Sequence, residues 1–309
     1  MADRSEAFTE TQVIATLREI FASPDPRIEV GIGDDAAVVA GDVRQVMTTD
    51  MAVEGVHFRI DWSTAFEIGR KVTAANAADI LAMGGVPDYL LVAVALTGSE
   101  SMEWIHDLAH GIKFEAFQAG LQIIGGDISR SENVIISMTA IGHCAKPILR
   151  SGAKPGDGIY LSSLTGWSAA GLALLKSKAP ATTDVMKKAL SEFKSPTIDY
   201  GFDSSKATAM CDISDSIIEQ ASQVAVASRV QLHFDENLLA KSEEFNSLRS
   251  LAAELKIDIW QLIFGGGEDH VLFATGTDLP GVRIGEVLSG SGLSGIPAIE
   301  SDRVWSHFR

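Results

Sequence analysis

The chain has 309 residues, enough for one large domain or two of ordinary size. Its 25 Lys and Arg residues against 41 Asp and Glu residues give a formal net charge of −16. This charge disfavours nucleic acid and anionic membranes as main partners, because both bind basic faces. Hydrophobic residues make up 46% of the chain, which excludes a disordered protein and allows a sizeable core.

Neither the start of the chain nor its cysteines indicate export. Residues 1–6 include no basic segment followed by an apolar stretch, so we expect no signal peptide. A run of about 18 apolar residues, as a membrane span requires, is also missing. Cys144 and Cys211 lie in apolar surroundings and are expected to be buried thiols rather than a disulfide. We therefore expect a cytoplasmic protein.

Alternating helix and strand patterns fill the first half of the chain. A capping box at 9–12 precedes a helical pattern, and a second at 64–67 opens a helix that Gly84-Gly85 ends. A third helix is expected at about 102–119, followed by Gly120. Strands are predicted at 45–49, 89–97, 121–124 and 134–141.

Dense Gly and Pro turn chemistry at 145–158 predicts a domain boundary. We expect an N-terminal domain over 1–145 and a C-terminal domain over 146–309. In the second, strands are predicted at 159–162, 209–213 and 271–274, with helices at 168–176 and from Ser216. The stretches 178–208 and 235–258 indicate only helix and loop.

Acidic residues recur beside glycine or small residues where an apolar strand is expected to end, at 31–35, 48–50, 125–127, 212–215 and 265–269. Asp79 lies inside a helix, three residues after Asn76. A turn uses Asn, Ser or Gly as readily as Asp, so the repetition favours a ligand role. Lys and Arg are scarce around these segments, and a buried carboxylate needs a cation. The pattern therefore indicates Mg²⁺, which carboxylates bind together with substrate phosphates.

Other phosphate-binding and catalytic motifs are missing from the sequence. It has no P-loop, no protein-kinase H-R-D or D-F-G set, and no G-x-S-x-G elbow. Residues 31–36 fit G-x-G-x-x-A, but two acids in that loop would repel a bare pyrophosphate. His106 and His110 lack the glutamate of the H-E-x-x-H zinc motif.

In their order along the chain and in their residues, these acidic segments resemble those of the thiamine-monophosphate kinase family, within the superfamily of aminoimidazole-ribonucleotide synthetase. The resemblance covers nearly the whole chain, and the segment 54–58 and the Trp-x-His-Phe tail are its most specific parts. The matching segments are 31–36, 48–50, 54–58, 76–79, 82–87, 125–127, 150–157, 212–215, 266–269 and 305–308.

The resemblance implies a two-domain mixed sheet-and-helix fold, α/β in the N-terminal domain and α+β in the C-terminal domain. It implies Mg²⁺-assisted, in-line transfer of phosphate from ATP to thiamine monophosphate, and a homodimer formed through the N-terminal domain. The implied metal ligands are Asp35, Thr48, Thr49, Asp50, Asp79, Asp127, Asp212 and Asp215, of which Asp50, Asp127 and Asp215 are implied to be catalytic. The implied nucleotide contacts are Gly126, Asp127, Arg150 and Ser214, and the implied substrate contacts are His57, Glu268 and Trp305.

The chain departs from the family pattern at two places in the second domain. Ser216 stands where the family has glycine, and His270-Val271 follows Glu268-Asp269 where the family has Tyr-Glu. Two alternatives stay open, another ATP-using enzyme of the superfamily and a non-catalytic nucleotide-binding relative. The reactive N-terminal cysteine of selenophosphate synthetase and the C-terminal cysteine of the hydrogenase-maturation relative are both missing.

Overall fold

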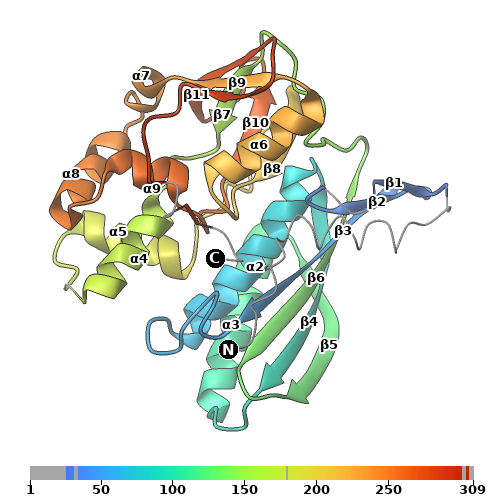
Figure 1. Ribbon diagram of the computed structural model, residues 1–309. Coiled ribbons are helices and arrows are strands. Elements are labelled where there is room, and N and C mark those ends of the chain that lie inside the picture. Colours follow the sequence, from blue (N-terminus) through green and yellow to red (C-terminus); the bar gives the residue numbers. More distant parts are fainter. Residues whose placement is uncertain (1–25, 31–33, 179, 301–303, 306–309) are drawn as a thin grey trace, which may run out of the picture.

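The computed structural model describes residues 26–30, 34–178, 180–300 and 304–305. The helix expected after residues 9–12, the loop 31–33 and the tail 306–308 lie outside this description. Two six-stranded sheets carry the fold, in the orders β1-β2-β3-β6-β4-β5 and β12-β9-β11-β7-β10-β8. Figure 1 shows helix α2 running between them. This agrees with the expected mixed sheet-and-helix architecture.

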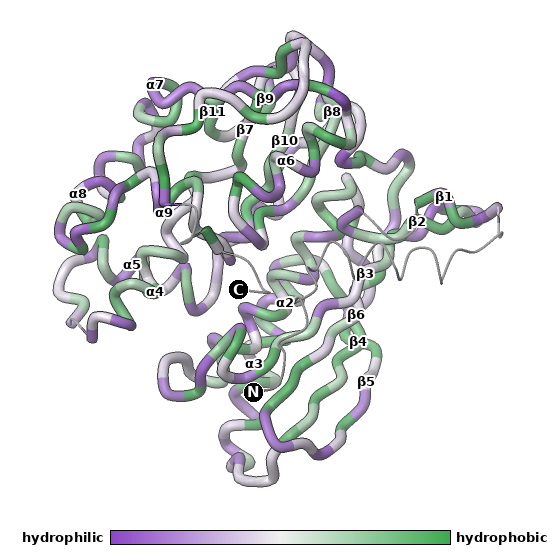
Figure 2. Tube along the Cα trace, viewed as in Figure 1, coloured by the Kyte–Doolittle hydropathy of each residue, from purple (hydrophilic) through white to green (hydrophobic). Residues whose placement is uncertain are grey.

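The first sheet carries two long helices on one face. Its strands are β1 Ile28–Val30, β2 Ala37–Val39, β3 Arg44–Val53, β4 Val86–Leu96, β5 Gln122–Arg130 and β6 Ile135–Cys144, and its helices are α2 Ala65–Ala82 and α3 Met102–Ala119. Strand β4 is coloured mainly hydrophobic in Figure 2. Alternate residues of β6, such as Ile136 and Met138, are buried under the helices, and their neighbours face the opposite side.

The two long helices start and stop as their sequences indicate. Thr64 and Glu67 form the expected reciprocal capping box at the start of α2. Gly120 ends α3 in the left-handed conformation at φ 78°. The helices pack closely, because a Cβ on Gly111 would lie 2.1 Å from the Phe66 carbonyl oxygen.

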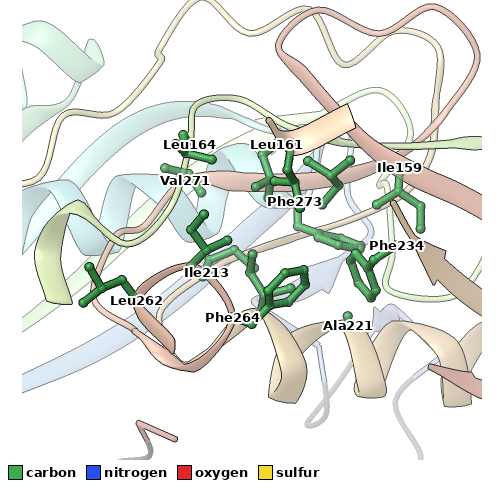
Figure 3. Packing of buried hydrophobic residues seen from close by; sticks show 14 of the residues in the cluster. Ile159, Leu161, Leu164, Ile213, Ala221, Phe234, Leu262, Phe264, Val271 and Phe273 are labelled. Atoms are coloured by element: carbon green, nitrogen blue, oxygen red, sulfur yellow. The ribbon is translucent and has the colours of Figure 1, made fainter. Parts of the chain in front are cut away.

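The second sheet contributes the larger core. Its strands are β7 Gly158–Leu161, β8 Ala207–Asp212, β9 Gln231–Phe234, β10 Leu272–Gly276, β11 Val282–Leu288 and β12 Gly292–Ser294. Six helices accompany it, α4 Trp167–Ser177, α5 Asp184–Lys194, α6 Ile217–Ser228, α7 Glu236–Leu239, α8 Phe245–Leu255 and α9 Ile259–Gly265. Figure 3 shows Phe234 and Phe264 in this core. Their ring centroids are 5.3 Å apart, in an edge-to-face arrangement.

Two acidic segments expected at strand ends lie within strands instead. Strand β3 continues through 48–50 to Val53, because it pairs with β6 from Arg44↔Cys144 to Val53↔Ile135. Strand β5 runs through 125–127 to Arg130, paired in parallel with β4. A Cβ on Gly126 would lie 1.7 Å from the Val92 carbonyl oxygen, so this glycine permits close strand approach rather than a turn.

The chain passes from the first sheet to the second through residues 145–157. The division into 1–145 and 146–309 stays a prediction. Ala82 at the end of α2 packs with Met210 of β8 and Leu272 of β10, which brings the second sheet against this helix. Among the described helices, none combines the length and apolarity needed to cross a membrane.

Candidate active site

Three carboxylates from distant parts of the sequence meet where α2 lies against β8. Asp35 precedes β2, Asp79 is on α2, and Asp212 ends β8. One oxygen from each lies within 4.8 Å of the others. The packing of α2 against the second sheet therefore assembles the cluster from both halves of the chain.

Hydrogen bonds fix two of these carboxylates. The Thr48 hydroxyl donates to Oδ2 of Asp79 across 2.6 Å, and the Asp212 backbone N–H donates to Oδ1 of Asp35 across 3.4 Å. Oδ2 of Asp35 is buried and has no hydrogen-bond partner among the described residues. One oxygen of Asp35 is thus held by the protein, and the other is available to a ligand.

Burial and mutual repulsion disfavour three negative charges in this cluster. Desolvation, together with the charges of Asp50 and Asp212, raises the pKa of Asp79 well above its ordinary value. Desolvation also raises the pKa of Asp35, although Arg150 works in the opposite direction. A divalent cation among these oxygens would offset both effects, so the donor set and its electrostatics fit Mg²⁺.

Arg150 lies at the edge of the carboxylate cluster. Its Nη2 donates to Oδ1 of Asp35 at 2.9 Å and to Oε1 of Gln220 at 3.2 Å. Gln220 in turn donates to the Ser214 hydroxyl at 3.4 Å. The structure therefore brings together Arg150 and Ser214, both expected at the nucleotide. Gln220 was not among the expected site residues, because a glutamine inside a helix carries no motif of its own.

Strand alternation separates the candidates on β3. Thr49 faces the side of the sheet away from the helices, where its hydroxyl donates to the Met138 carbonyl oxygen at 2.9 Å and accepts from Thr139. The structure does not bring the Thr49 side chain to the carboxylate cluster. Asp50 lies on the helix side with Thr48, near enough for its charge to raise the pKa of Asp79. Asp215 lies three residues after Asp212 and directly before Ser216, the N-cap of α6.

Gly126 and Asp127 lie on the exposed edge strand β5, away from the cluster. Asp127 pairs with Ala93 of the neighbouring strand β4. Ala93 pairs in turn with Ser137 of β6, and Ser137 pairs with Met51 of β3. Three strand spacings place it about 14 Å from Met51, on the face opposite the helices. Within one chain, the structure does not bring Asp127 to the other candidate ligands.

A cavity of about 740 Å³ has none of the three cluster carboxylates in its lining. Its walls come from the segment after β3, from α4 and α9, and from the loop that follows α9. His57, Glu268 and Trp305, the three expected substrate contacts, all line it. The other aromatic residues in the lining are Phe58, Trp62 and Phe193. The cavity therefore suits a ligand with aromatic rings.

Backbone contacts fix the loop between the cavity and the cluster. The Glu268 N–H donates to the Ser214 carbonyl oxygen at 2.7 Å, and Nδ1 of His270 lies 3.1 Å from Oδ2 of Asp212. Glu268 also pairs with Lys71 on α2 at 2.9 Å. A Cβ on Gly267 would lie 2.3 Å from Cδ1 of Trp305. The glycine loop thus lets the indole lie directly against the backbone.

Both departures from the family pattern are accommodated locally. Ser216 is the N-cap of α6, and its hydroxyl accepts from the Glu219 N–H at 3.2 Å, so that helix starts normally. His270 is buried against Asp212. The residue before His270, Asp269, accepts hydrogen bonds from the N–H groups of Gly166 and Ser168. These two bonds fix the start of α4.

Comparison with known proteins identifies the family. The family model of the AIR synthase related protein, N-terminal domain, matches residues 33–144. A thiamine-monophosphate kinase of Mycobacterium tuberculosis is 37% identical over 271 residues, covering 84% of this chain and 80% of the relative. The chain belongs to the thiamine-monophosphate kinase family. The family member of Corynebacterium glutamicum is 36% identical over 254 residues, covering 79% of this chain and 76% of its own.

The fold matches a solved member of this kinase family. The structure of AaThiL complexed with AMPPCP and TMP has a TM-score of 0.87 and 26% sequence identity, and the match covers 97% of each chain. The resemblance inferred from the sequence is thereby confirmed for the family and for the fold. The relative was solved with an ATP analogue and TMP, the two kinds of ligand that the sequence indicated.

Proposed function

We propose that this protein transfers the γ-phosphoryl group of ATP to the phosphate of thiamine monophosphate, the last step of thiamine diphosphate biosynthesis. The observation that carries this proposal is that one loop, residues 266–270, reaches both the aromatic cavity and the carboxylate cluster. Glu268 lines the cavity, and two residues later His270 contacts Asp212 of the cluster. A phosphate bound along that loop would lie between the two places.

Asp35, Asp79 and Asp212 would hold Mg²⁺, with Asp50 near Asp79 and with Thr48 orienting Asp79. We include Asp215, three residues after Asp212, as a further candidate ligand. When bound, Mg²⁺ neutralises phosphate charge and holds two polyanions in line. The acceptor is a phosphate oxygen that is already anionic at neutral pH. The chain therefore needs no strong general base, which agrees with the absence of a histidine or lysine among the implied catalytic residues.

The remaining site residues bind and orient the two substrates. Arg150 would bind nucleotide phosphate while it holds Asp35, and Ser214 would add a hydroxyl beside it. Trp305 would cover the cationic thiazolium ring by a cation–π contact. Glu268 lines the same cavity, and an oxygen of its carboxylate would face that ring.

A homodimer through the first sheet would cover an apolar face that the single chain exposes. On the side away from α2 and α3, Met51 is 59% exposed, Tyr89 47% and Leu91 37%. All nine residues of β5 are exposed. A second copy on this face would place Gly126 and Asp127 in or beside the interface, which gives these two residues access to a shared site.

A cytoplasmic location fits the two cysteines, because Cys144 and Cys211 are buried free thiols. Such thiols persist in a reducing compartment. A cell-fractionation experiment with an antibody to the protein would test this part of the proposal, and recovery in the membrane or extracellular fraction would contradict it.

The activity is tested by incubating the purified protein with ATP, Mg²⁺ and thiamine monophosphate. Chromatography should show equal amounts of thiamine diphosphate and ADP. An Asp212→Asn variant should make neither, because it loses a cluster carboxylate. Binding of Mg-ATP without product would favour the non-catalytic alternative. ADP release with a different phosphate or carboxylate acceptor would favour another superfamily reaction.

A further inference from the structure

A buried lysine that the proposed chemistry does not use lies behind the cavity wall. Lys71 is on α2, and its side chain is 7% exposed. Its Nζ lies 2.9 Å from Oε2 of Glu268, whose side chain is 10% exposed. The same Nζ donates to the Phe193 carbonyl oxygen at 3.1 Å and lies 4.6 Å from the centre of the Phe193 ring.

These contacts join three elements at one ammonium group. Lys71 belongs to the helix of the first sheet, Glu268 to the loop after α9, and Phe193 to the end of α5. Glu268 and Phe193 both line the cavity, whereas Lys71 does not. The ammonium group therefore holds two parts of the cavity wall from behind.

The ion pair with Lys71 supports an uncommon conformation of Glu268. Its φ is +65°, a backbone conformation that residues other than glycine seldom adopt. Its carboxylate is almost fully buried, and a buried charge is strongly unfavourable without a partner of opposite sign. Lys71 supplies that partner. The lysine itself is satisfied by the carboxylate and the Phe193 carbonyl oxygen.

We propose that Lys71 is a positioning residue for the thiamine-monophosphate half of the site. It orients the Glu268 carboxylate and the Phe193 wall toward the substrate, and it has no part in holding ATP. This inference rests on the proposed function, because it assigns the cavity to thiamine monophosphate. It predicts a selective effect on one of the two substrates.

The test uses Lys71→Met, which keeps most of the side-chain length and removes the charge. We expect the KM for thiamine monophosphate to rise about 10- to 100-fold, the size of effect found when a side chain that orients a metal ligand is removed. The KM for ATP should stay within about twofold. Lys71→Arg should recover part of the loss. The matched control is Lys194→Met, which breaks a more exposed ion pair between α5 and Glu67 at 3.4 Å and should change neither KM.

A double-mutant cycle separates positioning from general damage. In a Glu268→Gln background, Lys71→Met should have little further effect, because no buried charge is left without a partner. An equal effect in both backgrounds, or an equal rise of both KM values, would overturn the proposal.

Crystallography tests the same idea without turnover. In Lys71→Met, the Glu268 carboxylate should leave its place in the cavity wall, and an unmoved carboxylate would refute the positioning role. If the wild-type protein forms no thiamine diphosphate, the proposed function fails, whereas this structural comparison still decides whether Lys71 positions Glu268.

Discussion

Oδ1 of Asp35 accepts from the Asp212 backbone N–H across 3.4 Å, and this bond joins residues 177 positions apart in the chain. The same oxygen also accepts a hydrogen bond from Nη2 of Arg150 at 2.9 Å. The two donors hold one side of the carboxylate and leave Oδ2 for a cation. A ligand oriented in this way loses little freedom when it binds metal, so the two halves of the chain together prepare the site.

Asp79→Asn should separate catalysis from stability. The substitution removes one of several half-buried carboxylates that repel one another, so the metal-free protein should melt at the same or a higher temperature. The kinase rate should fall at least about 100-fold, because a charge-stabilising group is lost from the reacting centre. The rate is measured at saturating Mg²⁺, and the melting temperature in EDTA and in Mg²⁺.

The control for this experiment is Asp107→Asn, the same change at an exposed position on α3. It should leave both the rate and the Mg²⁺-induced rise in melting temperature unchanged. The assignment of Asp79 to the metal would fail if Asp79→Asn kept a full Mg²⁺-induced rise.

Met51→Glu should turn the proposed dimer into a monomer. The charge would lie in the middle of the apolar face of the first sheet, where desolvation in an interface is unfavourable. Light scattering coupled to gel filtration should show the mass falling by half. Met102→Glu is the matched control, because Met102 is 77% exposed on α3, away from that face. A wild-type protein that is already monomeric would contradict the proposed dimer.

Local patterns predicted much of the fold. The capping box at Thr64 and Glu67, the end of α3 at Gly120 and the N-cap at Ser216 all depend on contacts within a few residues, and all are present. Helices α5, α8 and α9 were not resolved from the sequence. Thr183 and Asp258 cap the first and the last of them, but such short signals do not separate a helix from a turn. The apolar residues of these helices pack into the core of the second sheet.

The sequence offers a list of candidate site residues but no geometry for them. A run such as Thr48-Thr49-Asp50 reads as one unit, yet pairing of β3 with β6 sends Thr49 to the opposite face. Lys71 and Gln220 carry no motif, and only the packing of α2 and α6 places them at the site. Register and tertiary contact therefore decide what the sequence leaves open.

Asp269 should make stability fall as the pH rises toward neutrality. Burial raises the pKa of its carboxyl from 3.8 to about 6, although the N–H groups of Gly166 and Ser168 lower it. The folded state therefore holds this proton more tightly than the unfolded state does. The resulting stabilisation is complete below about pH 3.8 and is lost as the pH rises through about 6.

Asp269→Asn removes this titration and should flatten the corresponding part of the pH profile. The difference in unfolding free energy between wild type and variant should fall by roughly 2 to 3 kcal/mol between pH 4 and 7. The variant also loses one acceptor for these N–H groups, which lowers its unfolding free energy by the same amount at every pH. The change of the difference with pH therefore decides the outcome. Melting curves across this pH range measure it, and parallel profiles for wild type and variant would disprove the raised pKa.

Gly267→Ala should weaken substrate binding by displacing one indole ring. The new Cβ would lie 2.3 Å from Cδ1 of Trp305 and 3.0 Å from the Ser214 carbonyl oxygen, so the ring or the loop has to move. Because Trp305 lines the cavity, we expect the KM for thiamine monophosphate to rise about tenfold, equal to roughly 1.4 kcal/mol.

Gly201→Ala is the matched control, since the nearest atom to its Cβ is 3.5 Å away. Quenching of tryptophan fluorescence by thiamine monophosphate gives the binding constant directly. Equal constants for wild type and Gly267→Ala would remove Trp305 from the substrate site.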